Sequence, residues 1–174
     1  ASGSAFKFPN TVYNAAGGYL SICSGIKGYN VTVTNGAQSG LASMAYAMSV
    51  LRSGQENAML ATGSDENSDT MTELFGKLGV TSEKVVAPFA GNDGFVLSDG
   101  SASVLIEDEK AARERGARIY CHASGYGMAH SSVKFGTLTG SEAGLTNAVN
   151  NALADAGMTI DDIDAVFGFA NGMK

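Results

Sequence analysis

The stretch VTVTNGAQSG, Val31–Gly40, limits the possible folds of this chain more than any other feature of the sequence. Its β-branched half favours a buried strand, and Asn35-Gly36 then marks a tight turn. An apolar helix begins at Leu41, so the sequence predicts a strand, a turn and a helix in close succession. Several enzymes present a nucleophile at the tip of such an elbow. Here the tip carries Ala37, which has no reactive atom.

Helical and strand-like segments alternate along the whole chain. Apolar residues recur either at helical spacing or in short runs that end at glycine-rich turns. This alternation predicts the α/β class, with a sheet that is covered on both faces. The expected helices cover residues 10–26, 41–53, 71–78, 109–115 and 141–156. The expected strands cover residues 29–34, 57–62, 118–125 and 165–169, with a strand pair over 95–107 that turns at Asp99-Gly100.

Composition excludes several classes of partner. The chain has 174 residues, a net charge of -6 and an isoelectric point near 4.8. This acidity argues against nucleic acid or an anionic membrane as the ligand. No apolar run is long enough to span a membrane. Two cysteines, Cys23 and Cys121, give no disulfide framework, so we expect one globular domain, or part of a larger one, in the cytoplasm.

The residues alone define no catalytic constellation. Ser39 lacks the flanking glycines of a serine nucleophile elbow, because Ala37 and Leu41 stand in their places. Cys23 lies on an apolar helix face, which indicates a core or interface position. We interpret the acidic loop residues as solvated and the two histidines as structural, because neither set has metal-ligand spacing. These residues are Asp65, Glu66, Asp69, His122 and His130.

Three segments, in order along the chain, resemble the β-ketoacyl synthases of the thiolase fold. Residues 13–66 resemble the family's dimer-facing helix, strand and active-site elbow. Residues 92–127 contain a DGF turn, a glycine-rich hairpin and an ERGA segment, and residues 152–172 resemble the helix and strand before the first catalytic histidine. The resemblance implies a layered α/β/α/β/α fold. Residues 1–174 would form its middle part, the end of the N-terminal half and the start of the C-terminal half.

The family's reactive groups are missing from the matching positions. The cysteine that takes the acyl chain falls on Ala37. The first catalytic histidine falls on Phe169, or on Asn171 after a shift of two residues. An RPFD segment is degraded to VAPFA at residues 86–90. A methyl group cannot form a thioester, and Phe donates no hydrogen bond to an oxyanion.

This pattern resembles the chain-length factor of type II polyketide synthases, a non-catalytic subunit that pairs with an active ketosynthase. The resemblance implies a heterodimer, a shared acyl tunnel, no bound cofactor or metal, and acyl chains delivered to the partner on the phosphopantetheine of an acyl carrier protein. The elbow pocket would comprise Gln38, Ser39 and Gly40. The interface and tunnel residues would be Tyr19, Ile22, Cys23, Asn30, Val31, Thr32 and Val33.

Two other interpretations remain open. In the first, the chain is a fragment of an active β-ketoacyl synthase with a Cys-to-Ala change at position 37. That reading explains Ala37 but neither Phe169 nor the lost RPFD segment. In the second, a Gln-type elbow decarboxylates malonyl groups, which would still require the missing histidine. The family's second histidine would lie beyond Lys174, so we expect this chain to be a middle piece.

Overall fold

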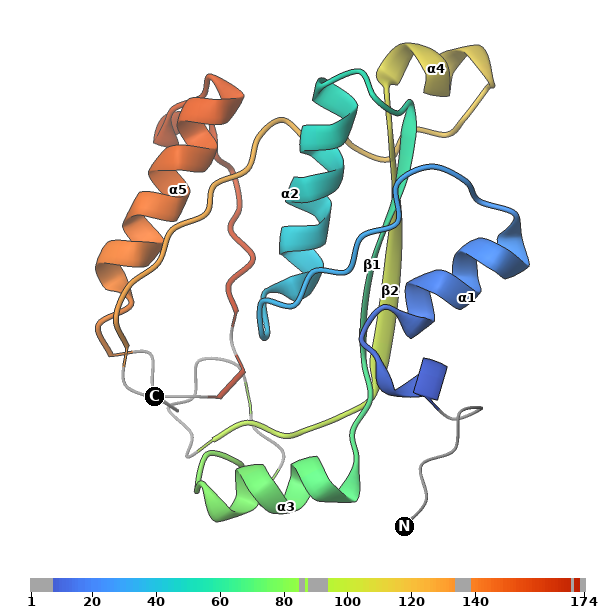
Figure 1. Ribbon diagram of the computed structural model, residues 1–174. Helices are drawn as coiled ribbons and strands as arrows, with labels where there is room; N and C mark the ends of the chain where they lie inside the picture. The colour runs from blue at the N-terminus through green and yellow to red at the C-terminus, as the bar shows by residue number, and fades with distance from the viewer. Residues whose placement is uncertain (1–7, 85–86, 88–93, 134–138, 170, 173–174) are drawn as a thin grey trace. The chain divides into compact units, whose positions relative to one another are not determined.

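The computed structural model describes residues 8–84, 87, 94–133, 139–169 and 171–172 (Figure 1). The chain divides into two compact units, the first formed by residues 1–63 and 102–119 and the second by residues 64–101 and 120–174. Its helices and strands are η1 Phe8–Thr11, α1 Ala15–Ser24, α2 Ser39–Arg52, β1 Ala58–Asp65, α3 Asp69–Lys77, β2 Gly100–Glu107, α4 Glu109–Glu114, α5 Glu142–Ala156 and η2 Ile160–Asp162.

Strands β1 and β2 form the two-stranded sheet, and most of both strands belongs to the first unit. The Asp108 amide donates to the Asn57 carbonyl at 3.0 Å, and the hydroxyls of Thr62 and Ser103 are 2.9 Å apart. Residue numbers therefore rise on one strand as they fall on the other, so the strands are antiparallel. Six of the eight residues of β2 are exposed, so in this chain the sheet is not covered on both faces as the sequence predicted.

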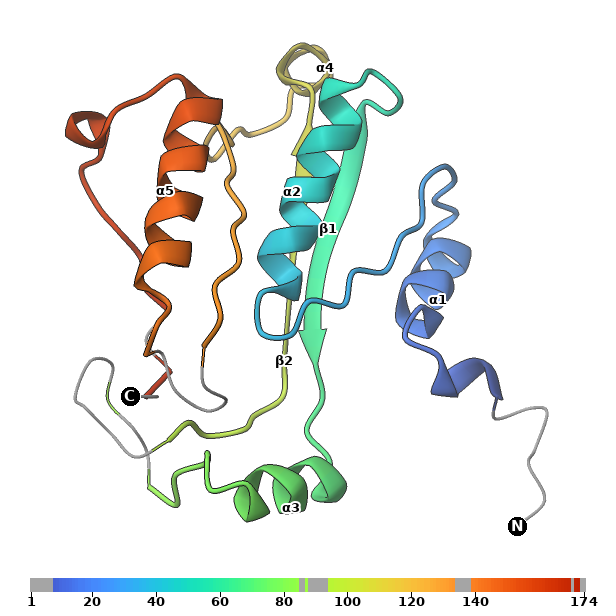
Figure 2. The ribbon, with the colours of Figure 1, turned by 60° about the vertical axis from the view of Figure 1, so that its left-hand side comes forward.

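Helix α2 lies along the β1–β2 pair in both ribbon views (Figures 1 and 2). Its buried residues are Ala45, Ala47, Met48 and Val50. The sequence assigned Leu41, Met44 and Leu51 to its core face, but Leu41 is exposed and the other two are half-buried. The helix ends at Arg52, and Gly54 follows with a φ of 71°, as the glycine in the sequence predicted.

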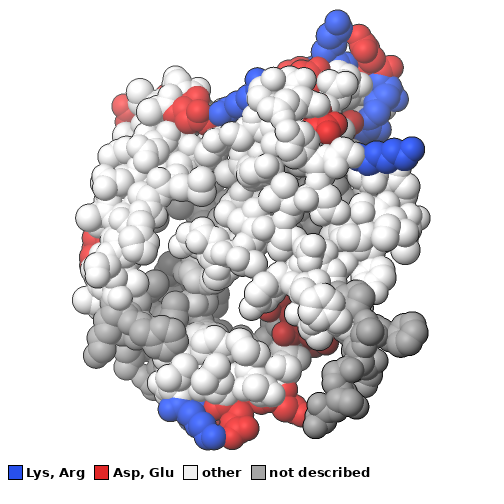
Figure 3. Space-filling model, viewed as in Figure 1, with Lys and Arg blue, Asp and Glu red and all other residues white. Residues whose placement is uncertain are grey.

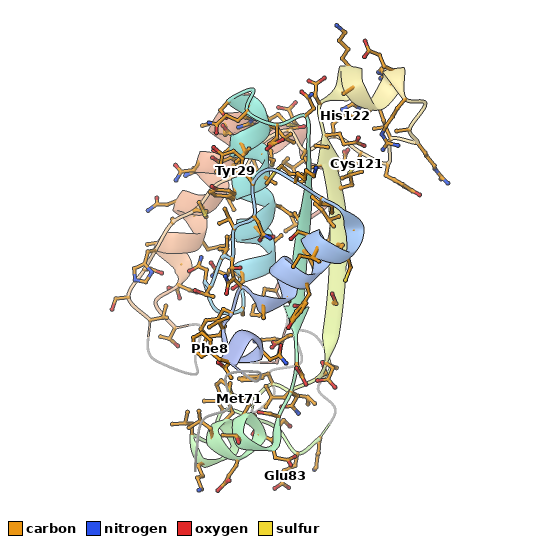
Figure 4. All side chains as sticks on the ribbon, turned by 45° about the vertical axis from the view of Figure 1, so that its right-hand side comes forward. Phe8, Tyr29, Met71, Glu83, Cys121 and His122 are labelled. Carbon is orange, nitrogen blue, oxygen red and sulfur yellow. The ribbon has the colours of Figure 1, made fainter. Side chains whose placement is uncertain are left out.

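Helix α1 has an apolar composition but no buried residue. It ends as predicted at Gly25, whose φ of 65° is the left-handed conformation that glycine adopts without strain. The following segment is tied back to the helix by Asn30. Its Nδ2 donates to the Gly17 carbonyl at 3.1 Å and to Ser21 Oγ at 3.2 Å. Tyr29, labelled in Figure 4, lies on this segment between α1 and α2.

The second unit contains α3 and α5. The Ser68 hydroxyl caps α3 by accepting from the Met71 amide at 3.2 Å, and Phe75 meets Phe95 edge to face with ring centroids 5.6 Å apart. Residues 125–131 run directly along α5, where a Cβ on Gly127 would lie 2.0 Å from the Ala148 carbonyl oxygen. Only glycine permits this approach of one backbone to another.

Four predicted strands are absent from the described residues. Residues 29–34, 96–99, 118–125 and 165–169 have no regular strand conformation, and Phe95 makes a single bridge to Thr81. No hairpin forms at Asp99-Gly100. These segments have the β-branched and aromatic composition of strands, but a strand requires backbone hydrogen bonds to a neighbour. In the described residues no neighbouring strand pairs with them, so composition alone gave the wrong prediction.

Candidate functional site: the elbow before helix α2

The elbow at residues 35–39 joins an extended segment to α2. Gly36 has a φ of 59°, which lets the chain reverse, and the Ser39 amide donates to the Gly36 carbonyl at 3.1 Å. Gln38 is the N-cap residue of α2, but its side chain makes no capping hydrogen bond. Ala37 is therefore one residue before the N-cap and two before the first residue of the helix, and it is exposed. The predicted turn and helix are present without the predicted strand before them, and the tip of this elbow carries a methyl group.

Ser39 ties the two sides of this turn together. Its Oγ accepts a hydrogen bond from the Asn35 amide at 2.8 Å and donates one to the Gly36 carbonyl at 2.7 Å. Sequence reasoning rejected Ser39 as a nucleophile and placed it in the elbow pocket, but it missed this hydrogen-bonding role. The available signal was a serine three residues after a glycine turn, because Ser and Thr hydroxyls commonly bond to the carbonyl at i−3.

The start of α2 is packed against β1 through two glycines. A Cβ on Gly63 would lie 3.2 Å from the Gly40 Cα, tighter than an ordinary van der Waals contact. The two backbones therefore approach more closely than side chains on both would comfortably allow. This contact fixes where the elbow helix begins relative to the sheet. The predicted elbow residues follow Ala37 directly in the chain: Gln38 is the N-cap residue, Ser39 begins α2, and Gly40 contacts β1.

The positions predicted for the first histidine belong to the second unit. Phe169 is 60% exposed and lies at the end of an extended segment after η2. Asn171 is half-buried and has a polar partner, and Gly172 turns the chain with a φ of 89°. The degraded RPFD segment lies outside the described residues except for Ala87. Within the second unit, neither position 169 nor position 171 offers an imidazole.

The predicted interface residues are mostly on the surface. Ile22 is 77% exposed, Val33 is half-buried and Cys23 is exposed, so the core interpretation of Cys23 is wrong. The other exposed members of the predicted set are Tyr19, Asn30, Val31 and Thr32. Its exposed apolar members, Tyr19, Ile22 and Val31, lie on one helix and the following segment, which is typical of a surface that another element covers.

Charged side chains gather away from the elbow helix. Figure 3 shows acidic and basic residues over α3 and α4, whereas α2 carries only Arg52. Arg115 Nε donates to Glu107 Oε1 at 2.9 Å, and this hydrogen bond lowers the pKa of the Glu107 carboxyl. The Thr159 amide and hydroxyl similarly lower the pKa of the Asp162 carboxyl. Each pair stabilises the local conformation of the chain, between residues 107 and 115 and between residues 159 and 162.

In the part of the chain that the structure describes, no group of three or more His, Cys, Asp or Glu residues is arranged to hold a metal ion. His122 does not lie on the predicted strand but on an irregular exposed segment, and it has a polar partner (Figure 4). Among the described helices, none has the length and apolar character that crossing a membrane requires.

Comparison with known proteins shows the family of the chain. A sequence model described as the N-terminal domain of β-ketoacyl synthases matches residues 2–112. The chain belongs to the β-ketoacyl synthase family. It is 30% identical, over 171 residues, to 3-oxoacyl-[acyl-carrier-protein] synthase 2 of Vibrio cholerae; the match covers 94% of this chain and 41% of that protein. The chain therefore spans well under half the length of this relative.

Solved structures give the same fold. A ketosynthase in complex with a type II polyketide synthase acyl carrier protein matches with a TM-score of 0.88 at 21% identity, covering 97% of this chain and 44% of that one. The ishigamide ketosynthase/chain length factor matches with a TM-score of 0.83 at 26% identity, covering 94% of this chain and 40% of that one. The chain is thus part of a thiolase-like α/β fold, as the sequence predicted.

Proposed function

We propose that this chain is part of a non-catalytic chain-length factor subunit, which pairs with an active ketosynthase in type II polyketide or related polyene biosynthesis. The observation that carries this proposal is the intact elbow with Ala37 at its tip. The one hydroxyl of the elbow, that of Ser39, already accepts from Asn35 and donates to Gly36. A serine nucleophile needs a base that takes its proton, and here the proton is directed to a carbonyl.

Phe169 supports the same conclusion. Decarboxylation of a malonyl group leaves an enolate, and its oxyanion must be stabilised by positioned hydrogen-bond donors. A phenyl ring donates none, and removing one such donor typically slows an enzyme about a hundred- to a thousandfold. In this proposal residues 1–174 form the end of the N-terminal half and the start of the C-terminal half of the subunit, and the partner supplies the reacting groups.

The partner surface in this proposal is α1 with residues 29–34. Its small and apolar residues suit close approach, and residues 29–34, which form no regular strand here, have no strand partner in the described residues. An obligate interface of this kind buries on the order of 2,000 Å² or more. Tyr19, Ile22 and Cys23 would then reach toward the acyl tunnel of the ketosynthase. An acyl carrier protein would deliver the phosphopantetheine-bound chain to that ketosynthase.

The alternative is a fragment of an active synthase that carries a Cys-to-Ala change at position 37. One observation is compatible with this alternative. The hydrogen-bonded elbow would place a thiol at position 37 just before the start of α2. A helix N-terminus stabilises a thiolate. The two proposals differ in what happens when the thiol is restored.

Ala37→Cys distinguishes them. The variant is made in the full-length subunit and is combined with a ketosynthase partner whose own nucleophilic cysteine has been removed. We expect the new thiol to react with iodoacetamide, because the elbow presents it. We expect neither decarboxylation of malonyl carrier protein nor chain elongation, measured by mass spectrometry of the carrier protein. The wild-type pair is the control, and turnover by the Ala37→Cys subunit would favour the active-synthase alternative.

A further inference from the structure

The elbow keeps a defined shape although its tip residue makes no polar contact through its side chain. Gln38, the N-cap residue, provides no capping hydrogen bond. Ser39, the first residue of α2, makes both of the side-chain hydrogen bonds described within the turn. Its hydroxyl bonds to the amide of Asn35 on the incoming segment and to the carbonyl of Gly36 in the turn.

The hydrogen bonds of residue 39 stabilise the turn on both of its sides. The Gly36 carbonyl accepts from the Ser39 amide as well as from its hydroxyl, at 3.1 and 2.7 Å. The Gln38 amide donates to the Asn35 carbonyl at a longer 3.4 Å. The short contacts are thus the ones that involve residue 39. The next residue, Gly40, packs on Gly63, so the clamp and the sheet contact are adjacent in the chain.

We infer that Ser39 is a positioning residue, which holds position 37 at the N-terminus of α2 whatever side chain position 37 carries. The elbow then does not depend on a nucleophile for its shape. This accounts for its persistence with Ala37 at the tip, and it applies equally to a chain-length factor and to a synthase with an altered cysteine.

The chain offers a matched control for the test. Ser43 lies one turn later on α2, and its hydroxyl donates to the Gly40 carbonyl at 2.7 Å with the same i−3 spacing. Removing the Ser43 hydroxyl deletes the same kind of hydrogen bond from the same helix, but it leaves the elbow contacts intact. Ser39→Thr is the conservative variant, because it keeps a hydroxyl at the same branch point.

The first measurement follows the Asn35 amide in the full-length subunit with Ala37 in place. This amide donates to Ser39 Oγ, so Ser39→Ala should accelerate its hydrogen exchange by roughly fivefold or more, as expected for the loss of one hydrogen bond. We expect no change at Asn35 in Ser43→Ala and restored protection in Ser39→Thr. Unchanged exchange in Ser39→Ala would overturn the inference.

The second measurement uses Ala37→Cys as a probe of position, read from the pH dependence of alkylation. Peptide-resolved mass spectrometry separates the probe from the exposed Cys23 and Cys121. At a helix N-terminus the thiol pKa should lie roughly half a unit below about 8.5. Ser39→Ala should return it toward that value and slow alkylation at pH 7 about threefold. Equal pKa values with and without the Ser39 hydroxyl, or an equal shift in Ser43→Ala, would contradict the inference; turnover plays no part in either measurement.

Discussion

Helices α1 and α2 belong to the same compact unit and have similar apolar compositions, yet they are packed very differently. On α2, which lies along the β1–β2 pair (Figure 2), Met48 is 6% exposed and Ala47 is 1% exposed. On α1, no residue is buried, and Ile22 is 77% exposed. One helix therefore meets its apolar partner within this chain, whereas the other leaves its apolar side chains on the surface.

This difference shows the limit of apolar composition as a signal. It predicts that a helix surface is covered, but it does not identify the element or chain that covers it. Burial of apolar area is favourable wherever the covering atoms come from. For α2 they come from the chain itself. For α1, under the chain-length-factor proposal, they come from the ketosynthase partner. The following experiments test this contrast, beginning with the largest expected effect.

Met48→Ala and Ile22→Ala should separate the two helices most clearly. Removing the buried Met48 side chain should lower the free energy of unfolding by about 2–5 kcal/mol. Truncating the exposed Ile22 should change it by less than about 0.5 kcal/mol when the partner is absent. Denaturant unfolding of the subunit gives both values. Native mass spectrometry with the ketosynthase should then show weaker association for Ile22→Ala. A similar decrease in the free energy of unfolding for both variants without a partner would contradict the contrast between the two helices.

Two glycines test the same contrast at the level of the backbone. Gly63→Ala places a Cβ 3.2 Å from Gly40 at the start of α2, so we expect a loss of about 1–3 kcal/mol through overpacking. Gly18 on α1 has open space around an added Cβ. Gly18→Ala should therefore stabilise the subunit alone by about 0.5–1 kcal/mol, because alanine favours the helix. Thermal unfolding measures both, and destabilisation by Gly18→Ala without a partner would show a contact on α1 that this chain makes itself.

Cys23→Phe should have the smallest effect on stability and a specific effect on product. Because Cys23 is exposed, a larger side chain meets no packed core in this chain. If Cys23 lines the partner's tunnel, the heterodimer should assemble normally and release shorter chains. Product mass spectrometry measures the length, and Cys121→Phe serves as the exposed-cysteine control. Unchanged product length with intact assembly would count against a tunnel position for Cys23.

Helices were predictable because their signals are local. Gly25, Gly54 and Gly157 end three of them, each with a positive φ, and the expected helical spans agree to within two residues, except that α1 begins at Ala15, five residues after its expected start. The strands expected over residues 29–34 and 165–169 do not form in this structure, and residue patterns could not reveal this, since a strand requires a neighbour that lies elsewhere in the sequence or in another chain. At the elbow, the sequence identified the turn and the missing thiol at Ala37.

The sequence by itself determined the family, the alternation of elements and the absence of a cysteine at position 37, because these depend on residue identity and short-range order. Only the tertiary structure decided that Ser39 clamps the turn, that Gly40 packs on Gly63 and that α1 remains uncovered in this chain. Each of these depends on a hydrogen-bond geometry or a backbone separation. The Gly40–Gly63 separation arises when segments far apart in the sequence pack together, whereas the Ser39 clamp is local but depends on the orientation of one hydroxyl; residue patterns encode neither directly.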